Sequence, residues 1–255
     1  MKAKKSLGQH FLKTEHIAER IANSFAQTHQ RVLEIGPGRG MLTKYLLQQK
    51  FNLLVVETDR DMVLYLQKHY PQLKDRIVSA NFLKVQLDLL FSGQSFGLIG
   101  NFPYNISSQI VFRMLEYRTL VPEMVGMFQK EMAERIISPP GSKTYGVISV
   151  LTQAHYEGEY LFTVQPEHFI PPPRVQSGVI RLVRKPASEF QCNHKLFRTV
   201  VKQAFSQRRK MLRNTLKSLL DDNTLKTDPF FRQRPEKLSV QDYINLTNRV
   251  EAYRI

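Results

Sequence analysis

Short apolar runs alternate with helix-like patterns through the first half of this chain. The apolar positions of 41–47 recur at helical spacing, whereas compact apolar runs typical of buried strands occur at 31–35, 51–56, 76–82, 96–99 and 121–128. Regular alternation of strands and helices predicts an α/β fold with a doubly wound, mostly parallel sheet. A later run at 175–183 predicts a further strand that completes this sheet.

The second half of the chain is organised differently. A helical pattern at 129–137 is broken by Ser138-Pro139-Pro140-Gly141, and 146–156 fits a strand or a helix equally well. The turn-forming stretch Lys185-Pro186-Ala187-Ser188 marks a domain boundary, after which the pattern is helical. We therefore predict two domains, 1–185 and 186–255, the first beginning with an arm and one helix.

Glycines or polar residues follow the first three predicted strands. Gly36-Pro37-Gly38-Arg39-Gly40 is a glycine-rich turn that lets a ligand approach the backbone, although such turns also serve tight strand–helix packing. Glu57 follows about 20 residues later, where an acidic side chain commonly binds the hydroxyls of a ribose. Asn81 is either a contact to an adenine edge or an ordinary loop residue. Because the carboxyl ends of parallel strands share one sheet edge, we expect a nucleotide-type site there.

The fourth strand leads into Asn101-Phe102-Pro103-Tyr104. The side-chain oxygen of Asn101 and the backbone carbonyl of Pro103 can both accept hydrogen bonds from one planar amino group. Such acceptors localise the lone pair of an adenine amine, which is otherwise delocalised into the ring. Tyr104 offers a flat face on which a base can stack, a contact worth ~1–3 kcal/mol. The alternative is a simple turn, because Asn, Pro and Tyr are common at strand ends.

Composition narrows the class of protein. The 255 residues are 42% hydrophobic, enough for a sizeable core, and no apolar run approaches the ~18 residues that span a membrane. The chain starts without an apolar signal segment, and Cys192 is the single cysteine, so we expect a cytoplasmic protein without an intrachain disulfide. The seven histidines show no metal-ligand spacing and nothing indicates an obligate dimer, so we expect no metal and a monomer.

The net charge of +15 points to a polyanionic partner. Between 195 and 217 no acidic residue interrupts the basic ones, which are Lys195, Arg198, Lys202, Arg208, Arg209, Lys210, Arg213 and Lys217. Helical spacing of apolar residues in the same stretch predicts one or two helices with a basic outer face. A face of one sign favours phosphate binding over a merely solvated surface. A second basic group lies in the arm, at Lys2, Lys4, Lys5 and Lys13.

Nearly the whole chain resembles the small-subunit ribosomal RNA adenine dimethyltransferases. The matching stretches are 6–12, 33–40, 100–107, 129–135, 169–175, 204–214 and 234–239. The run Ala204-Phe205-Ser206-Gln207-Arg208-Arg209-Lys210 is especially specific, because resistance methylases of the large subunit share the front half of the pattern but generally lack this run. The resemblance implies a Rossmann-like class I methyltransferase domain with a small helical C-terminal domain. RNA would bind there through Lys202, Arg208, Arg209, Lys210 and Arg213.

The resemblance also implies a reaction. Two methyl groups pass from S-adenosyl-L-methionine to N6 of each of two adjacent adenosines near the 3′ end of 16S ribosomal RNA, in an assembling small subunit. Positions matching the cofactor contacts of the family are His10, Leu12, Gly36, Glu57, Asn81 and Asn101, and Gly38 belongs to the same glycine turn. The family more commonly has Asn at position 10, Asp at position 81 and Leu at position 102.

The catalytic residues would be Asn101, Pro103 and Tyr104, acting by direct displacement. Tyr104 stacks on an adenosine turned out of its helix or loop, and the two acceptors direct its N6 lone pair at the methyl group. Two alternatives stay open: a methyltransferase acting on large-subunit RNA or DNA, and an assembly factor that binds RNA without catalysis. The combination of Gly36, Glu57 and Asn101 argues against a pure binder, which has no need of them.

Overall fold

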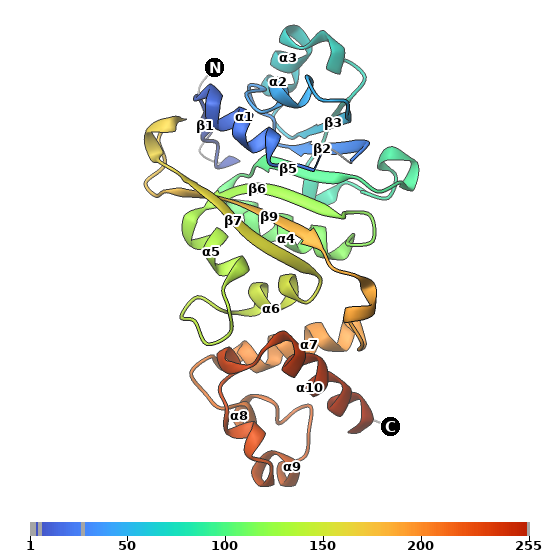
Figure 1. Ribbon diagram of the computed structural model, residues 1–255, viewed down its shortest axis with the longest axis vertical. Helices are drawn as coiled ribbons and strands as arrows, with labels where there is room; N and C mark the ends of the chain where they lie inside the picture. Colours follow the sequence, from blue (N-terminus) through green and yellow to red (C-terminus); the bar gives the residue numbers. More distant parts are fainter. Residues whose placement is uncertain (1–3, 5–6, 27–28, 254–255) are drawn as a thin grey trace. The chain divides into compact units, whose positions relative to one another are not determined.

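The computed structural model describes Lys4, residues 7–26 and residues 29–253, so Lys2 and Lys5 of the basic arm lie outside the described residues. The chain divides into two compact units (Figure 1). The first contains the chain up to Ala133 together with Gly158–Arg184, and the second contains Glu134–Glu157 and the chain from Lys185 onward. The domain limits 1–185 and 186–255 stay a prediction, and the second unit also includes a segment from the middle of the chain.

A seven-stranded sheet runs through the first unit. Its order is β4-β3-β2-β5-β6-β9-β7 (Figure 1), with parallel neighbours from β4 to β6 and β9 antiparallel to β6. The strands are β2 (Arg31–Ile35), β3 (Asn52–Glu57), β4 (Ile77–Ser79), β5 (Gly97–Asn101), β6 (Glu123–Gln129), β7 (Tyr156–Val164) and β9 (Ser177–Arg184). The predicted α/β fold with a mostly parallel, doubly wound sheet is therefore confirmed.

Helices pack on the sheet through their apolar faces. Ile21 of α1 and Leu46 of α2 are fully buried in one cluster with Val32 and Val55 of the sheet. β5 and β6 bury nearly every residue, as expected for parallel strands covered on both faces. The helices of this unit are α1 (Glu15–Asn23), α2 (Thr43–Leu46), α3 (Arg60–His69) and α4 (Ser107–Glu116), and α5 (Lys130–Ile137) begins in this unit and ends in the second.

Two further strand features are not predicted by the sequence. β1 (Phe11–Leu12) pairs antiparallel with β8 (Phe169–Ile170), which joins the N-terminal segment to a loop far along the chain. Strands of two residues carry no readable alternation. β7 is partly exposed along most of its length, so it also lacks the apolar run that identifies the other strands.

Helices make up most of the second unit. The segment 146–156, ambiguous in sequence, is helical as far as Gln153, because Ile148, Val150 and Leu151 all reach buried positions. No helix in the described part of the chain is long and apolar enough to cross a membrane. The helices are α6 (Val147–Gln153), α7 (His194–Ala204), α8 (Leu212–Thr215), α9 (Asp222–Thr227) and α10 (Val240–Tyr253).

The basic stretch forms two helices rather than one continuous basic face. The predicted apolar stripe of α7 is confirmed, since Val200 and Ala204 are buried. A short 3-10 segment follows α7, and Arg208, Arg209 and Lys210 then lie in the connection to α8, which we call the basic turn. Three of the five predicted RNA-binding residues therefore project from a turn and not from a helix face.

Candidate active site

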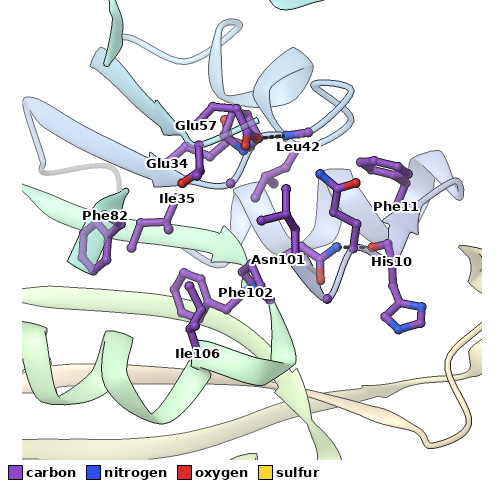
Figure 2. Close-up of a pocket in the computed structure, with 18 of the residues that line it drawn as sticks. His10, Phe11, Glu34, Ile35, Leu42, Glu57, Phe82, Asn101, Phe102 and Ile106 are labelled. Carbon is purple, nitrogen blue, oxygen red and sulfur yellow. Dashed lines mark hydrogen bonds between the residues drawn. The ribbon is translucent and has the colours of Figure 1, made fainter. Parts of the chain in front are cut away.

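The strand order changes direction beside β2, whose neighbours are β3 and β5. Ligands of open α/β sheets bind at such a point, outside the carboxyl ends of the strands. A cavity of about 290 Å³ lies there, with Glu57 and Asn101 facing it from β3 and β5, the strands on either side of β2 (Figure 2). We call it the sheet-edge site. It brings together all the predicted cofactor and catalytic residues: His10, Leu12, Gly36, Gly38, Glu57, Asn81, Asn101, Pro103 and Tyr104.

The glycine turn after β2 requires glycine for two reasons. Gly36, Gly38 and Gly40 have positive φ angles of 66°, 55° and 77°, which other residues rarely adopt. A side chain at Gly38 would also place its Cβ 2.9 Å from the Phe11 ring, and one at Gly40 would overlap the Tyr70 ring. The turn therefore lines the cavity with bare backbone, which leaves room for a ligand.

Two backbone amides hold Glu57 at the end of β3. Gly38 N donates to its Oε2 at 3.1 Å and Asp59 N donates to its Oε1 at 2.9 Å, so the carboxyl group is fixed in place. Burial raises the pKa of Glu57, and these backbone hydrogen bonds oppose the rise. Each oxygen keeps a further lone pair, and this arrangement suits a pair of neutral hydroxyl donors such as those of a ribose.

Asn81 follows β4 and caps a short 3-10 turn. Its Oδ1 accepts a hydrogen bond from Leu83 N at 2.9 Å, and the residue is exposed. Oδ1 keeps one lone pair and the amide nitrogen can donate, so Asn81 can donate toward a ring nitrogen of adenine or accept from its amino group. An Asp at this position would present only acceptors, so Asn81 keeps an acceptor and adds a donor relative to the commoner residue.

A hydrogen bond sets the orientation of the Asn101 amide at the end of β5. Its Nδ2 donates to the backbone carbonyl of His10 at 2.9 Å, so Oδ1 remains as the acceptor (Figure 2). The Pro103 carbonyl accepts from Ile106 N at 3.2 Å and keeps one lone pair. Two acceptors are thus present at this strand end, as the predicted chemistry on an amino group requires.

Tyr104 is held by a partner that sequence reasoning missed. Its hydroxyl lies 2.6 Å from the Oγ of Ser177, a buried residue at the start of β9. Burial raises the pKa of Tyr104, which keeps the phenol protonated, and the hydrogen bond to Ser177 opposes that rise. Only the pairing of β9 with β6, next to β5, brings Ser177 here, so no local sequence signal identifies it.

The N-terminal arm forms one wall of the cavity. Lys4 Nζ lies 2.6 Å from Asp59 Oδ1 and 2.7 Å from Asp61 Oδ2, and Gln9 Nε2 donates to Asp59 Oδ2 at 3.0 Å. Burial acts to raise the pKa of Asp59, but the hydrogen bonds from Lys4 and Gln9 prevail and lower it. Asp59 is therefore both the cap of α3 and the anchor of the arm.

Glu34 is a second residue that sequence reasoning missed. It lies on β2 beside the glycine turn, is 1% exposed, and accepts a hydrogen bond from Thr43 Oγ1 at 2.6 Å. Burial raises its pKa to about 8, although the bond from Thr43 opposes the rise. An acidic residue inside an apolar strand is unusual, and that contrast is the sequence signal that could have identified it.

The five predicted RNA-binding residues lie in the second unit, away from the cofactor and catalytic residues in sequence. Arg209 and Lys210 of the basic turn are exposed, and among the described residues no carboxylate forms an ion pair with either of them. Arg208 is half-buried and donates to Ser142 O at 3.1 Å. Lys202 is exposed on α7 and Arg213 is half-buried on α8. Exposed cations without acidic partners are suited to contacts with phosphate.

Comparison with known sequences gives close relatives. The sequence profile of the family described as "Ribosomal RNA adenine dimethylase" matches residues 1–251. The chain is 56% identical over 253 residues to the protein called ribosomal RNA small subunit methyltransferase A of Flavobacterium johnsoniae. The matched region covers 99% of this chain and 97% of that protein, so the similarity extends through both units.

Solved structures share the fold. A dimethyladenosine transferase from Plasmodium falciparum matches with a TM-score of 0.80 at 25% identity, over 96% of this chain and 99% of that one. The 23S rRNA methyltransferase ErmE matches with a TM-score of 0.66 at 22% identity, over 94% of this chain and 99% of that one. At the lower identity the likeness to ErmE establishes a common fold and nothing more.

Proposed function

Because this chain belongs to the ribosomal RNA adenine dimethylase family, we propose that it methylates N6 of two adjacent adenosines near the 3′ end of small-subunit ribosomal RNA. The methyl donor is S-adenosyl-L-methionine. The observation that carries the proposal is the fixed amide of Asn101, whose Nδ2 is bound to His10 O at 2.9 Å. That bond leaves Oδ1 to accept from an exocyclic amine, the group methylated in an N6-methyltransferase.

The residues of the sheet-edge site fit the cofactor. The carboxyl group of Glu57 keeps lone pairs for two ribose hydroxyls, and the Asn81 amide nitrogen can donate to adenine. The backbone at Gly38 provides space that any side chain would fill, since a Cβ there would press on Phe11. When bound, S-adenosylmethionine supplies an electrophilic methyl group.

The chain's own residues then act by positioning the target base. Tyr104 provides the stacking surface, and its ring is fixed by the bond to Ser177. Asn101 Oδ1 and the Pro103 carbonyl accept from the two N–H groups of the amine, which keeps the nitrogen lone pair out of conjugation with the ring. Correct placement of reacting groups can supply ~7–11 kcal/mol of a barrier. No strong base is needed, because the methylated nitrogen releases its proton to water.

The small-subunit substrate rests on two observations. The Flavobacterium relative, named for the small subunit, is similar over the full length of the chain. The basic turn also carries exposed cations that suit an RNA backbone. We further propose that the protein acts as a cytoplasmic monomer on a partly assembled small subunit. The alternative, methylation of large-subunit RNA, is represented by ErmE, whose likeness is restricted to the fold.

The test is to supply S-adenosylmethionine labelled in its methyl group together with one of three substrates. These are small subunits from cells that lack the modification, large-subunit RNA, and duplex DNA. We expect label only in the small subunits, with mass mapping giving two dimethylated adenosines next to each other. Preferential labelling of large-subunit RNA or DNA would identify the other enzyme class. Binding to small subunits without any transfer, by a protein that also fails to bind the cofactor in calorimetry, would identify an assembly factor.

A further inference from the structure

The side chain of His10 does not point into the part of the sheet-edge site around Glu57. Figure 2 shows the backbone of His10 beside Asn101 and its ring extending away from Glu57. The ring stacks on Tyr104, with centroids 5.4 Å apart and planes inclined by 28°. Its Nδ1 donates to the backbone carbonyl of Pro171 at 2.8 Å. The imidazole is thus placed on the ring that the proposed function assigns to the target adenine.

The stack leaves no room for a base between the two rings. Paired aromatic rings have centroids about 4.5–7 Å apart, so a base enclosed between two plates needs them to be separated by well more than one such pair. The centroids of His10 and Tyr104 are already within direct stacking distance at 5.4 Å. An adenine that is to stack on this face of Tyr104 must first displace the imidazole.

We propose that the ring of His10 occupies the place of the target base until that base arrives, and we call it a placeholder. This proposal rests on the proposed function. The ring of His10 covers the stacking face of Tyr104 until an extruded adenosine arrives, then rotates outward and gives up that place. His10 is therefore a residue that sets substrate affinity, and its ring is not a ligand of the cofactor. Its backbone serves the site separately, through the carbonyl that accepts from Asn101 Nδ2.

The attachments of His10 suit such an exchange. The bond to Pro171 is in an exposed position, where water replaces a lost hydrogen bond at little net cost. Rotation about the side-chain torsions moves the ring alone, so the carbonyl can stay on Asn101 while the imidazole leaves. Adenine is a larger stacking partner than imidazole, and the exchange therefore favours the substrate once its base is extruded.

Replacement of His10 with Asn tests the proposal, because Asn keeps the backbone and removes the competing ring. We expect the KM for RNA to fall about three- to tenfold, since the base no longer displaces a stacked ring. The kcat should change little, and the affinity for S-adenosylmethionine, measured by calorimetry, should be retained. A rise in KM would mean that His10 is a second plate that supports the base, and an unchanged KM would mean that its ring is irrelevant. Either result overturns the proposal.

A matched control exists in the same unit. His69 also stacks on a tyrosine, Tyr65, with centroids 3.9 Å apart, and its Nδ1 also donates to a backbone carbonyl. His69 lies on α3 outside the sheet-edge site. His69→Asn removes the same kind of stack and should leave the KM for RNA at the wild-type value. A lower KM in this variant too would show a general effect of lost histidine stacking.

A spectroscopic measurement follows the ring itself. In protein with isotope-labelled histidine, the ring protons of His10 should be shifted upfield by Tyr104 and should lose this shift when RNA binds. If the wild-type enzyme methylates no RNA, the proposed function is wrong, and the placeholder is then tested with a different probe. The probe is adenosine, added to protein whose cofactor site is filled with S-adenosylhomocysteine. Adenosine should then remove the same ring shift. A His10 signal that keeps its position in saturating RNA, or in saturating adenosine where no RNA is methylated, contradicts the placeholder.

Discussion

The sheet-edge site of the first unit and the basic turn of the second differ in how their polar groups are held. At the sheet edge, Glu57 and Asn101 each have part of their hydrogen-bonding capacity bound to backbone, and the remaining lone pairs face the cavity. In the basic turn, Arg209 and Lys210 are exposed, and no ion pair orients them within the described residues. The polar groups of one region are oriented by the protein before any ligand arrives, whereas the other offers exposed charge that no ion pair among the described residues orients.

The two arrangements provide different kinds of selectivity. Fixed acceptors discriminate by geometry, because a displaced amine would lose both hydrogen bonds. Exposed cations respond to phosphate density and to salt, and they carry no sequence information of their own. Changes at the sheet edge should therefore affect the chemical step, and changes in the basic turn should affect binding and its salt dependence.

The largest effect is expected from Asn101→Ala. Loss of one preorganised hydrogen-bonding group at a reacting centre typically lowers kcat about 10²–10³-fold, and RNA binding and the fold should persist because Asn101 is only half-buried. Single-turnover methyl transfer and a filter-binding assay measure the two quantities separately. The matched control is Asn52→Ala, because Asn52 is exposed at the start of β3, the end of that strand away from Glu57. This variant should leave methyl transfer and RNA binding unchanged. Transfer at the wild-type rate by Asn101→Ala would remove this residue from the mechanism.

A smaller and different effect is expected when Arg209→Ala and Lys210→Ala are combined. Two lost phosphate contacts should weaken RNA binding roughly tenfold and reduce the slope of log affinity against log salt by about two. The kcat at saturating RNA should stay near the wild-type value. Binding measured at several salt concentrations gives the slope.

The control for the basic turn removes equal charge elsewhere in the second unit. Lys226→Ala combined with Arg232→Ala alters two exposed residues, one of them already paired with Asp222. The salt slope should then change less than in the basic-turn variant. Equal slopes for both pairs would mean that only net charge matters, and that the turn has no special place in RNA binding.

A further effect concerns the stability of the fold and its dependence on pH through Glu34. The pKa of this carboxyl is raised by burial from 4.5 to about 8 in the folded chain, so between these values the folded state binds the extra proton. The free energy of unfolding should therefore fall as pH rises through this window, by at most ~1.4 kcal/mol per pH unit. Glu34→Gln should remove this contribution. Urea unfolding of both proteins at pH 5, 6, 7 and 8 measures it, and parallel curves would contradict the assignment.

The sequence predicts the sheet-edge site well because its residues follow strands directly. Parallel strands align their carboxyl ends, so finding Gly36, Glu57, Asn81 and Asn101 after consecutive strands is enough to expect them at one edge. The contribution of the arm is harder to foresee. Lys4 and Asp59 are far apart in the sequence, and no local pattern of residues predicts that they pair. The resemblance to a family indicates which residues matter, but it does not give the contact between Lys4 and Asp59.

Other features escape prediction because long-range pairing creates them. Ser177 reaches Tyr104 through the register of β9 on β6, and a shift of one residue would turn its side chain to the other face. The sequence predicts one or two helices with a basic outer face over 195–217, but the pattern does not indicate that Arg208, Arg209 and Lys210 lie in a turn. The chain leaves α7 at Ala204 and begins α8 only at Leu212, and the three cations lie within that interval.

The pairing of Phe11 with Ile170 has a consequence for biosynthesis. The arm is synthesised well before the strand that holds it, because β8 follows β1 by more than 150 residues. Chains are synthesised from the N-terminus at ~5–20 residues per second, so nascent protein spends many seconds without one wall of its cavity. The capacity to retain a cofactor should thus appear late in translation, when Ile170 has left the exit tunnel.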